Sequence, residues 1–248
     1  MHTKYEVKHG QRRFANILSA IGRRWMIITA LAVATTAALV AQGGELQQKF
    51  ATMKQSVAEN RQKLEQYQWV ETTQLTLKGD AKPPTQNLCR YGADGQVQKT
   101  PLGAPPPPSG GRLKQRMIAK KKAEMEDYMD EVKALLALYV PPDPQKMQQD
   151  YQAGKLSFNP VGGVVNFIFR DYAQPGDQMT LTFDPAQSTI VSLAVNTYMD
   201  DPKNVVTLQV QMASLPDGTR HVQQTVLNAT AKQLVATTTS SEYQKLGS

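Results

Sequence analysis

The sequence is short of the residue types that carry most enzymatic and metal chemistry. It contains one cysteine, Cys89, and three histidines, of which only His221 lies beyond residue 43. A single cysteine excludes an intramolecular disulfide, and these counts do not supply the three or four converging His and Cys ligands of a zinc site. Serine-hydrolase, zinc-protease, dinucleotide and phosphate-loop motifs are also missing beyond residue 43. We therefore expect no catalytic, metal-binding or cofactor-binding residues.

Long uncharged apolar runs are equally scarce, and the single one lies near the N-terminus at residues 25–41 (WMIITALAVATTAALVA). Before it stand one acidic residue, Glu6, and six basic ones: Lys4, Lys8, Arg12, Arg13, Arg23 and Arg24. An apolar run behind a basic flank is typical of an export signal or a short membrane anchor. As a helix it would span about 25 Å, slightly less than a bilayer core of roughly 30 Å. We expect residues 1–43 to be such a segment.

The end of this segment fits a signal-peptidase site. Ala41 and Gly43 place small residues at positions −3 and −1, so cleavage would separate Gly43 from Gly44. An uncleaved segment would instead tether the protein to the inner membrane. Either outcome places the rest of the chain in the periplasm or cell envelope. A lipid anchor is excluded, because acylation needs a cysteine at the cleavage site and the only one is Cys89.

Positive charge is concentrated in the same segment. The whole chain carries +7, but residues 1–43 hold six of its 28 basic and one of its 21 acidic residues, which leaves +2 for the remainder. A nearly neutral body is not typical of a nucleic-acid-binding protein. One basic run remains: Arg112, Lys114, Arg116, Lys120, Lys121 and Lys122. It reads as the solvated start of a helix, with contact to anionic lipid head groups as the alternative.

Residues 44–248 have the length of one domain. Their first half predicts a helix over 45–66, a strand over 67–78, and a hairpin formed by 87–91 and 96–100. The run PLGAPPPPSGG at 101–111 predicts a surface loop, because its prolines force extended backbone. A second helix follows over 112–139, with Ile118, Met125, Val132 and Tyr139 recurring every seven residues on one apolar face. A shorter helix is expected over 144–153.

The last third of the chain alternates between apolar and polar residues. Strands are expected from Val165, from Gln178, at 191–195, at 206–212, at 220–230 and at 233–239. Short connections between sequential strands predict an antiparallel meander, and one polar face per strand predicts a sheet covered on one side. The predicted fold class is therefore α+β, a curved antiparallel sheet (a half-barrel meander) covered by the two helical segments.

Two reactive side chains in the body are interpreted as inert. His221 stands in phase with Gln223 and Thr225, which predicts an exposed imidazole on the polar face rather than a catalytic base. Cys89 has no second cysteine nearby and is expected to be a half-buried thiol.

The order of elements resembles the half-barrel envelope family that includes the periplasmic lipoprotein carriers. The segments that carry the resemblance are 67–78, 90–100 (RYGADGQVQKT) and 178–218 with its closing Pro-Asp-Gly turn. The resemblance implies a curved sheet that wraps an apolar cavity holding acyl chains under a helical lid. Nine residues of this sequence would match the cavity lining: Val165, Phe167, Phe169, Met179, Leu181, Phe183, Val191, Leu193 and Val195. The same residues would equally serve as ordinary core against the 112–139 helix.

Three functional hypotheses follow. The first is a non-enzymatic envelope protein that binds a lipid or a lipidated partner in an apolar concavity of the sheet. The second is an envelope interaction or sensor module with a closed core. The third is a hydrolase in which distant carboxylates converge. No nucleic-acid partner is expected, and the sequence does not indicate an oligomeric state.

Overall fold

The computed structural model describes residues 59–103, 112–187 and 189–247. The predicted signal or anchor at 1–43, its cleavage site at Gly43 and Gly44, most of the predicted 45–66 helix and most of the Pro-rich loop lie outside these residues. Of the predicted 45–66 helix, residues 59–64 are described and are helical. Within the described ranges, none of the helices combines the length and the apolar character needed to cross a membrane.

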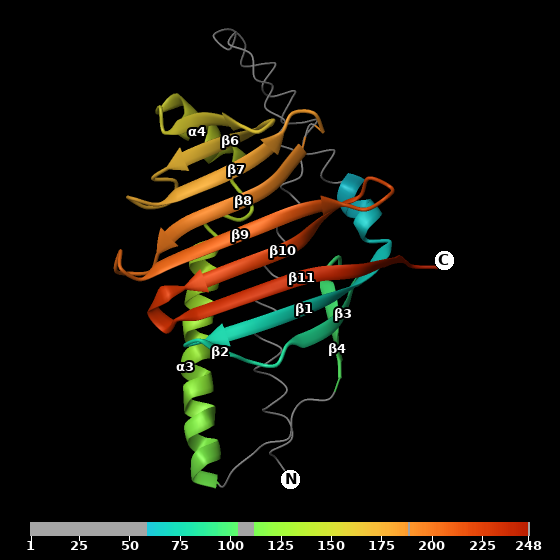
Figure 1. Cartoon of the computed structure of the whole chain (residues 1–248), viewed down its shortest axis with the longest axis vertical. Coiled ribbons are helices and arrows are strands. Elements are labelled where there is room, and N and C mark those ends of the chain that lie inside the picture. The colour runs from blue at the N-terminus through green and yellow to red at the C-terminus, as the bar shows by residue number, and fades with distance from the viewer. Residues whose placement is uncertain (1–58, 104–111, 188, 248) are drawn as a thin grey trace.

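One large antiparallel sheet dominates the molecule (Figure 1). Its strands are β1 (Tyr67–Leu77), β2 (Asp80–Ala81), β3 (Thr85–Tyr91), β4 (Val97–Leu102), β5 (Leu156–Val161), β6 (Val164–Arg170), β7 (Gln178–Asp184), β8 (Thr189–Tyr198), β9 (Val205–Ser214), β10 (Arg220–Ala229) and β11 (Leu234–Lys245). Their order is β4-β3-β1-β11-β10-β9-β8-β7-β6-β5, and the short β2 pairs with β1. The sheet is therefore open, with β4 and β5 at its edges. The predicted antiparallel meander is confirmed, and it is joined through β1 and β11 to a smaller one.

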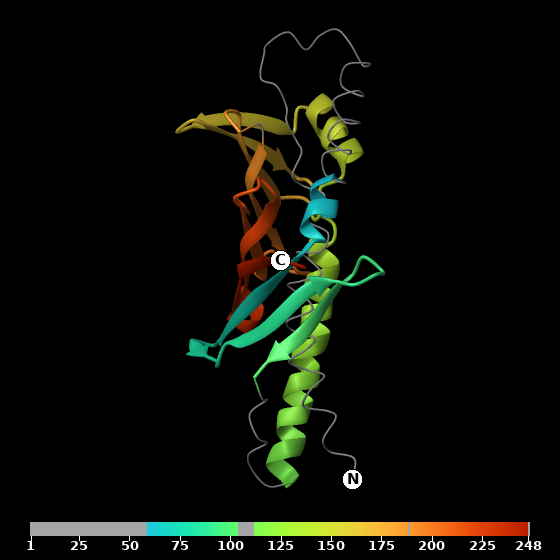
Figure 2. The same ribbon diagram turned by 90° about the vertical axis from the view of Figure 1, so that its right-hand side faces the viewer.

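Besides the helical residues 59–64, the described residues form α3 (Arg112–Leu136), α4 (Pro144–Gln152) and the short 3-10 helix η1 (Thr230–Lys232). Figure 2 shows α3 crossing one face of the curved sheet, with α4 near the end that carries β5 and β6. The predicted start of α4 is confirmed, and Asp143 caps it by accepting from the Gln145 amide at 2.8 Å. The helix ends at Gln152, one residue before the predicted end, and Gly154 follows with φ of 71°.

The C-terminal half of α3 forms the main core with strands β6 to β11. Met129, Val132 and Leu136 are at most 1% exposed and belong to the same cluster as the inward-facing strand residues. The N-terminal part of α3 is different, since it extends beyond the sheet (Figure 1) and Ile118 is 49% exposed. The predicted apolar face is confirmed, because Ile118 and Met125 line the same space between α3 and the sheet. Ile118 is exposed because that space is open.

Three details of the sheet differ from the sequence prediction. Strand β5 was not predicted; it contains Pro160, which is tolerated because β5 lies at the edge of the sheet. Strand β11 continues to Lys245 instead of ending at residue 239. A bulge between β7 and β8 pairs Phe183 with Ile190, so Val191 is only half-buried and Ile190 occupies the inward position in its place.

Candidate functional site

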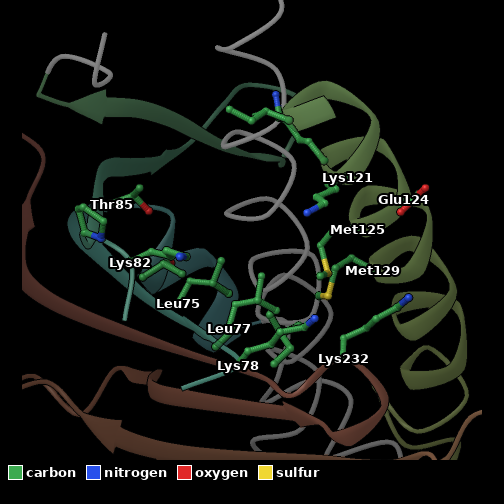
Figure 3. Close-up of a pocket in the computed structure, with 16 residues that line it drawn as sticks. Leu75, Leu77, Lys78, Lys82, Thr85, Lys121, Glu124, Met125, Met129 and Lys232 are labelled. Carbon is green, nitrogen blue, oxygen red and sulfur yellow. The ribbon is translucent and has the colours of Figure 1, made fainter. Parts of the chain in front are cut away.

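An apolar pocket of about 650 Å³ lies between α3 and the sheet, where the N-terminal half of the helix passes β1 and β11. Leu75 and Leu77 of β1 form its floor together with Leu234 and Ala236 of β11. Met125 and Met129 approach from α3, and Figure 3 shows them facing the two leucines of β1. The volume lies within the range of about 300–1,000 Å³ that is typical of ligand pockets.

The register of the sheet explains why the core does not extend uniformly across this face. Residues paired directly across strands share a face. One such row crosses the sheet from β5 to β3 and consists of Phe158, Phe167, Leu181, Leu193, Val210, Thr225, Thr238, Thr73 and Thr85. The row changes from large apolar side chains to threonines at β10. The threonine side fills less volume, and Thr73 and Thr85 line the pocket.

The mouth of the pocket is rich in lysine. Its charged lining residues are Lys78, Lys82, Lys121, Lys122, Lys232 and Glu124. Two backbone features bring Lys78 and Lys232 to the same end of the pocket. Lys78 adopts a positive φ of 54° in the turn after β1, and its amide donates to the carbonyl of Gln233 at 2.8 Å, next to η1. The turn after β1 and η1 thus lie side by side at the rim.

A second polar region lies nearer the start of β1. The carboxylate of Glu71 pairs with the ammonium of Lys99, and both side chains are at most 7% exposed. Cys89 lies beside this pair on the same face and is fully buried, not half-buried as predicted. Burial and, secondarily, the nearby Glu71 charge raise the pKa of the Cys89 thiol to about 12. The thiol is therefore protonated at neutral pH and is not an activated nucleophile.

His221 is buried, so the prediction of an exposed imidazole was wrong. The side chain is 5% exposed and its ring centroid lies 4.3 Å from that of Tyr243. Two features account for the error. The side of β10 that carries Thr225, which was predicted to be the exposed polar face, is the buried one, since Thr225 is 3% exposed. Asn60 also packs against the strand by bonding both the amide and the carbonyl of Arg220. Burial lowers the pKa of His221.

Asp177 is the centre of a buried hydrogen-bond cluster that sequence reasoning missed. It is 2% exposed and accepts from the amides of Tyr172, Ala173 and Gln174 at 2.5–2.9 Å. The hydroxyl of Tyr139, just after α3, also donates to it. The cluster closes the 171–177 turn and attaches the end of α3 to the sheet. The only sequence signal was the Pro-Gly-Asp turn directly before β7.

The described residues offer little for metal or acid–base chemistry. Nowhere within the described ranges do three or more His, Cys, Asp or Glu side chains lie close enough to hold a metal ion. The buried acids found there, Glu71, Asp150 and Asp177, lie next to a lysine or to hydrogen-bond donors. The pocket between α3 and the sheet, in contrast, has room for a ligand.

Of the nine residues predicted as a cavity lining, all except Val191 lie in the other half of the same face. Eight of them are buried in the core beneath α3, and Val191 is the half-buried exception. The lining residues of the pocket instead come from β1, β11 and α3, together with the turn after β1 and η1. Their sequence signal was weak, because Leu75 and Leu77 alternate with threonine and glutamine as in any half-buried strand.

Comparisons with known proteins add a distant structural likeness. No family model matches the chain, and no curated protein matches it. Among solved structures it is similar to a DUF1329 family protein from Desulfovibrio piger ATCC 29098, with 8% identity over 75% of this chain and 90% of that one. The TM-score of 0.33 is too low to carry an argument. What the protein does must therefore be argued from the pocket itself.

Proposed function

We propose that this protein is a non-enzymatic cell-envelope protein that binds the acyl chain of a lipid, or of a lipidated partner, in the pocket between α3 and strands β1 and β11. The observation that carries this proposal is the apolar space between the floor of leucines and the two methionines of α3. Apolar surface that the protein does not cover itself is stabilised when a ligand covers it.

The side chains around the pocket suit a flexible hydrocarbon. Met125 and Met129 are unbranched and adapt to chains of different shape. Each methylene transferred from water contributes about 0.8 kcal/mol, so a chain burying ten methylenes gains roughly 8 kcal/mol before the cost of association. Nothing in this binding needs a nucleophile or a general base, in keeping with the protonated thiol of Cys89.

The proposed location rests on the apolar run 25–41 and its basic flank. Exported with this segment, residues 44–248 would meet lipids at the outer surface of the inner membrane. N-terminal sequencing of the protein isolated from its own cells tests this part. A start at Gly44 supports a released domain, an intact N-terminus supports a tethered one, and recovery with the cytosolic proteins contradicts export.

Native mass spectrometry and ligand titration test the binding function. Protein purified from its own cells should carry lipid, and the delipidated protein should bind dodecanol, a neutral single-chain probe. Leu77→Glu introduces a charge into the pocket floor and should abolish dodecanol binding. Met125→Trp, which fills the space without a charge, should weaken binding as well.

Leu138→Glu is the matched control, since Leu138 is 56% exposed and does not line the pocket. This variant should bind dodecanol like the unmodified protein. Thermal unfolding of each variant separates loss of binding from loss of folding. A lipid-free mass, together with no dodecanol binding by the folded protein, would overturn the proposal and favour an interaction module with a closed core.

A further inference from the structure

Five lysines converge on one pocket from three separate stretches of the chain. Lys78 and Lys82 flank β2, Lys121 and Lys122 lie on α3, and Lys232 ends η1. Figure 3 shows the labelled lysines distributed around the leucines and methionines of the pocket. The sequence separated these residues, and the fold brings them together.

The negative charge at the pocket is small by comparison. Glu124 is the single acid among the lining residues, and its carboxylate lies 4.0 Å from the Nζ of Lys120, which is not a lining residue. Lys232 is also oriented by Tyr128, whose ring centroid is 5.4 Å from its Nζ. Lys122 has an interaction of its own, and the other four lysines still give the rim an excess of positive charge over Glu124.

This excess has an electrostatic consequence for a ligand. Like charges that gather at one rim repel each other, so the arrangement opposes folding slightly unless an anion joins it. Apolar walls of low dielectric constant strengthen the field at the mouth of a pocket and raise the local concentration of anions. Lysine ammonium groups bind carboxylate and phosphate as mobile point charges, which suits a head group exposed to water.

We propose that the ligand of this pocket is a single-chain lipid with an anionic head group, held with its chain between α3 and β1 and its carboxylate or phosphate among Lys78, Lys82, Lys121, Lys122 and Lys232. This inference rests on the proposed function, because it assigns the head group of the same ligand. It also gives a role to the basic start of α3, of which Lys121 and Lys122 are part.

Four probes with the same twelve-carbon chain test the head group: dodecanoate, dodecyl phosphate, dodecanol and dodecyltrimethylammonium, each below its micelle concentration. The two anions should bind about tenfold more tightly than dodecanol, and the cation should bind more weakly than dodecanol. Because the rim is exposed, raising the salt concentration from about 0.05 to 0.5 M should reduce the preference for the anions. Dodecanol binding should not weaken with salt.

Charge-reversal variants locate the preference. Lys78→Glu with Lys82→Glu should reduce the preference for the anions over dodecanol to about threefold or less. Lys155→Glu, at an exposed lysine beside β5 outside the pocket, is the matched control and should keep the full preference. A second pair, Lys121→Gln with Lys232→Gln, repeats the test without adding negative charge.

The outcomes separate this inference from the proposed function. Equal binding of dodecanoate and dodecanol would overturn the anionic head group and leave the acyl-chain function standing. An anion preference that survives both rim pairs would overturn the assignment of the head group to these lysines. Failure of all four probes to bind the folded protein would overturn both proposals.

Discussion

The two halves of the inward face of the sheet are built alike in backbone and differ in what covers them. In the half formed by β6 to β9, the inward-facing aromatic and aliphatic side chains pack with the C-terminal part of α3 and are buried. In the half formed by β1, β10 and β11, one row of inward positions is occupied by threonines beside a row of leucine and alanine, and the N-terminal part of α3 leaves the pocket. One helix and one sheet thus make a closed core and an open site.

The difference shows that side-chain volume, not strand pairing, decides where a space remains. The threonine at each of positions 73, 225 and 238 pairs as regularly as the leucines of β7 and β8. Thr73 and Thr238 satisfy each other through a hydrogen bond of 3.1 Å between their hydroxyls. They therefore tolerate burial without drawing the helix closer. Buried polar groups in this half also need hydrogen-bond or ion-pair partners. Removing such partners therefore tests the comparison of the two halves.

The largest effect is expected from the buried ion pair between Glu71 and Lys99. Lys99→Met leaves the Glu71 carboxylate without its cation in a buried site and should destabilise the protein by about 3–5 kcal/mol. The double change Glu71→Leu and Lys99→Met removes both charges and should return stability to near that of the unmodified protein. Urea unfolding measures all three proteins. Equal destabilisation by the single and double changes would show that the charges do not depend on each other.

Two truncations on α3 compare the closed and the open half directly. Leu136→Ala removes a fully buried side chain from the core and should cost about 2–5 kcal/mol of unfolding free energy. Met125→Ala shortens a half-buried side chain at the pocket and should cost about 1 kcal/mol or less, because part of its surface faces open space. Both replacements favour helix. Guanidinium titrations measure the difference, and similar costs would mean that the pocket is filled in solution.

The smallest effect concerns the pH dependence of stability that comes from the buried His221. Because burial lowers its pKa, the unfolded chain takes up the proton first. Its contribution to stability is therefore present above about pH 6.5 and is lost as the pH falls through the lowered pKa. His221→Gln should reduce the fall in melting temperature between pH 7.5 and about 5.5.

Asp217 provides the control in a different pH range. Hydrogen bonds from Thr219 and Tyr67 lower its pKa to about 2, so its contribution is present above its ordinary pKa and is lost only as the pH falls toward about 2. Asp217→Asn should leave the melting temperature difference between pH 7.5 and about 5.5 unchanged. If the pH dependence of the melting temperature persists in the His221 variant, it comes from a titratable group other than His221.

Much of the fold could be predicted from local patterns. The alternation of Val165, Phe167 and Phe169 and the heptad spacing of Met125 and Val132 depend on neighbours in the chain. The first appears in the structure as β6 and the second as α3, which ends at Leu136 and not at Tyr139 as predicted. The errors arose where distant segments intervene. Ile118 has the right spacing but lines an open pocket and stays exposed. His221 is buried because the side of β10 that carries Thr225 faces inward and Asn60 packs against the strand.

The candidate site was less predictable than the fold. Aliphatic strand residues indicated an inward face, but the same pattern describes a closed core and an open pocket. Only the placement of α3 shows that the inward-facing residues between Val165 and Val195 lie in the closed core. It also shows that Leu75 and Leu77 line the open pocket. The lysines of the rim were visible in the sequence, but nothing local connects Lys78 or Lys232 with Lys121.

By itself the sequence determined the antiparallel meander, the two principal helices and the scarcity of catalytic groups, because periodicity and composition are properties of neighbouring residues. The tertiary structure alone decided which part of the inward face is closed, that Glu71 and Lys99 are buried together, and that lysines from three stretches surround one apolar space. These facts depend on long-range packing of side-chain volume and charge, which no local pattern encodes.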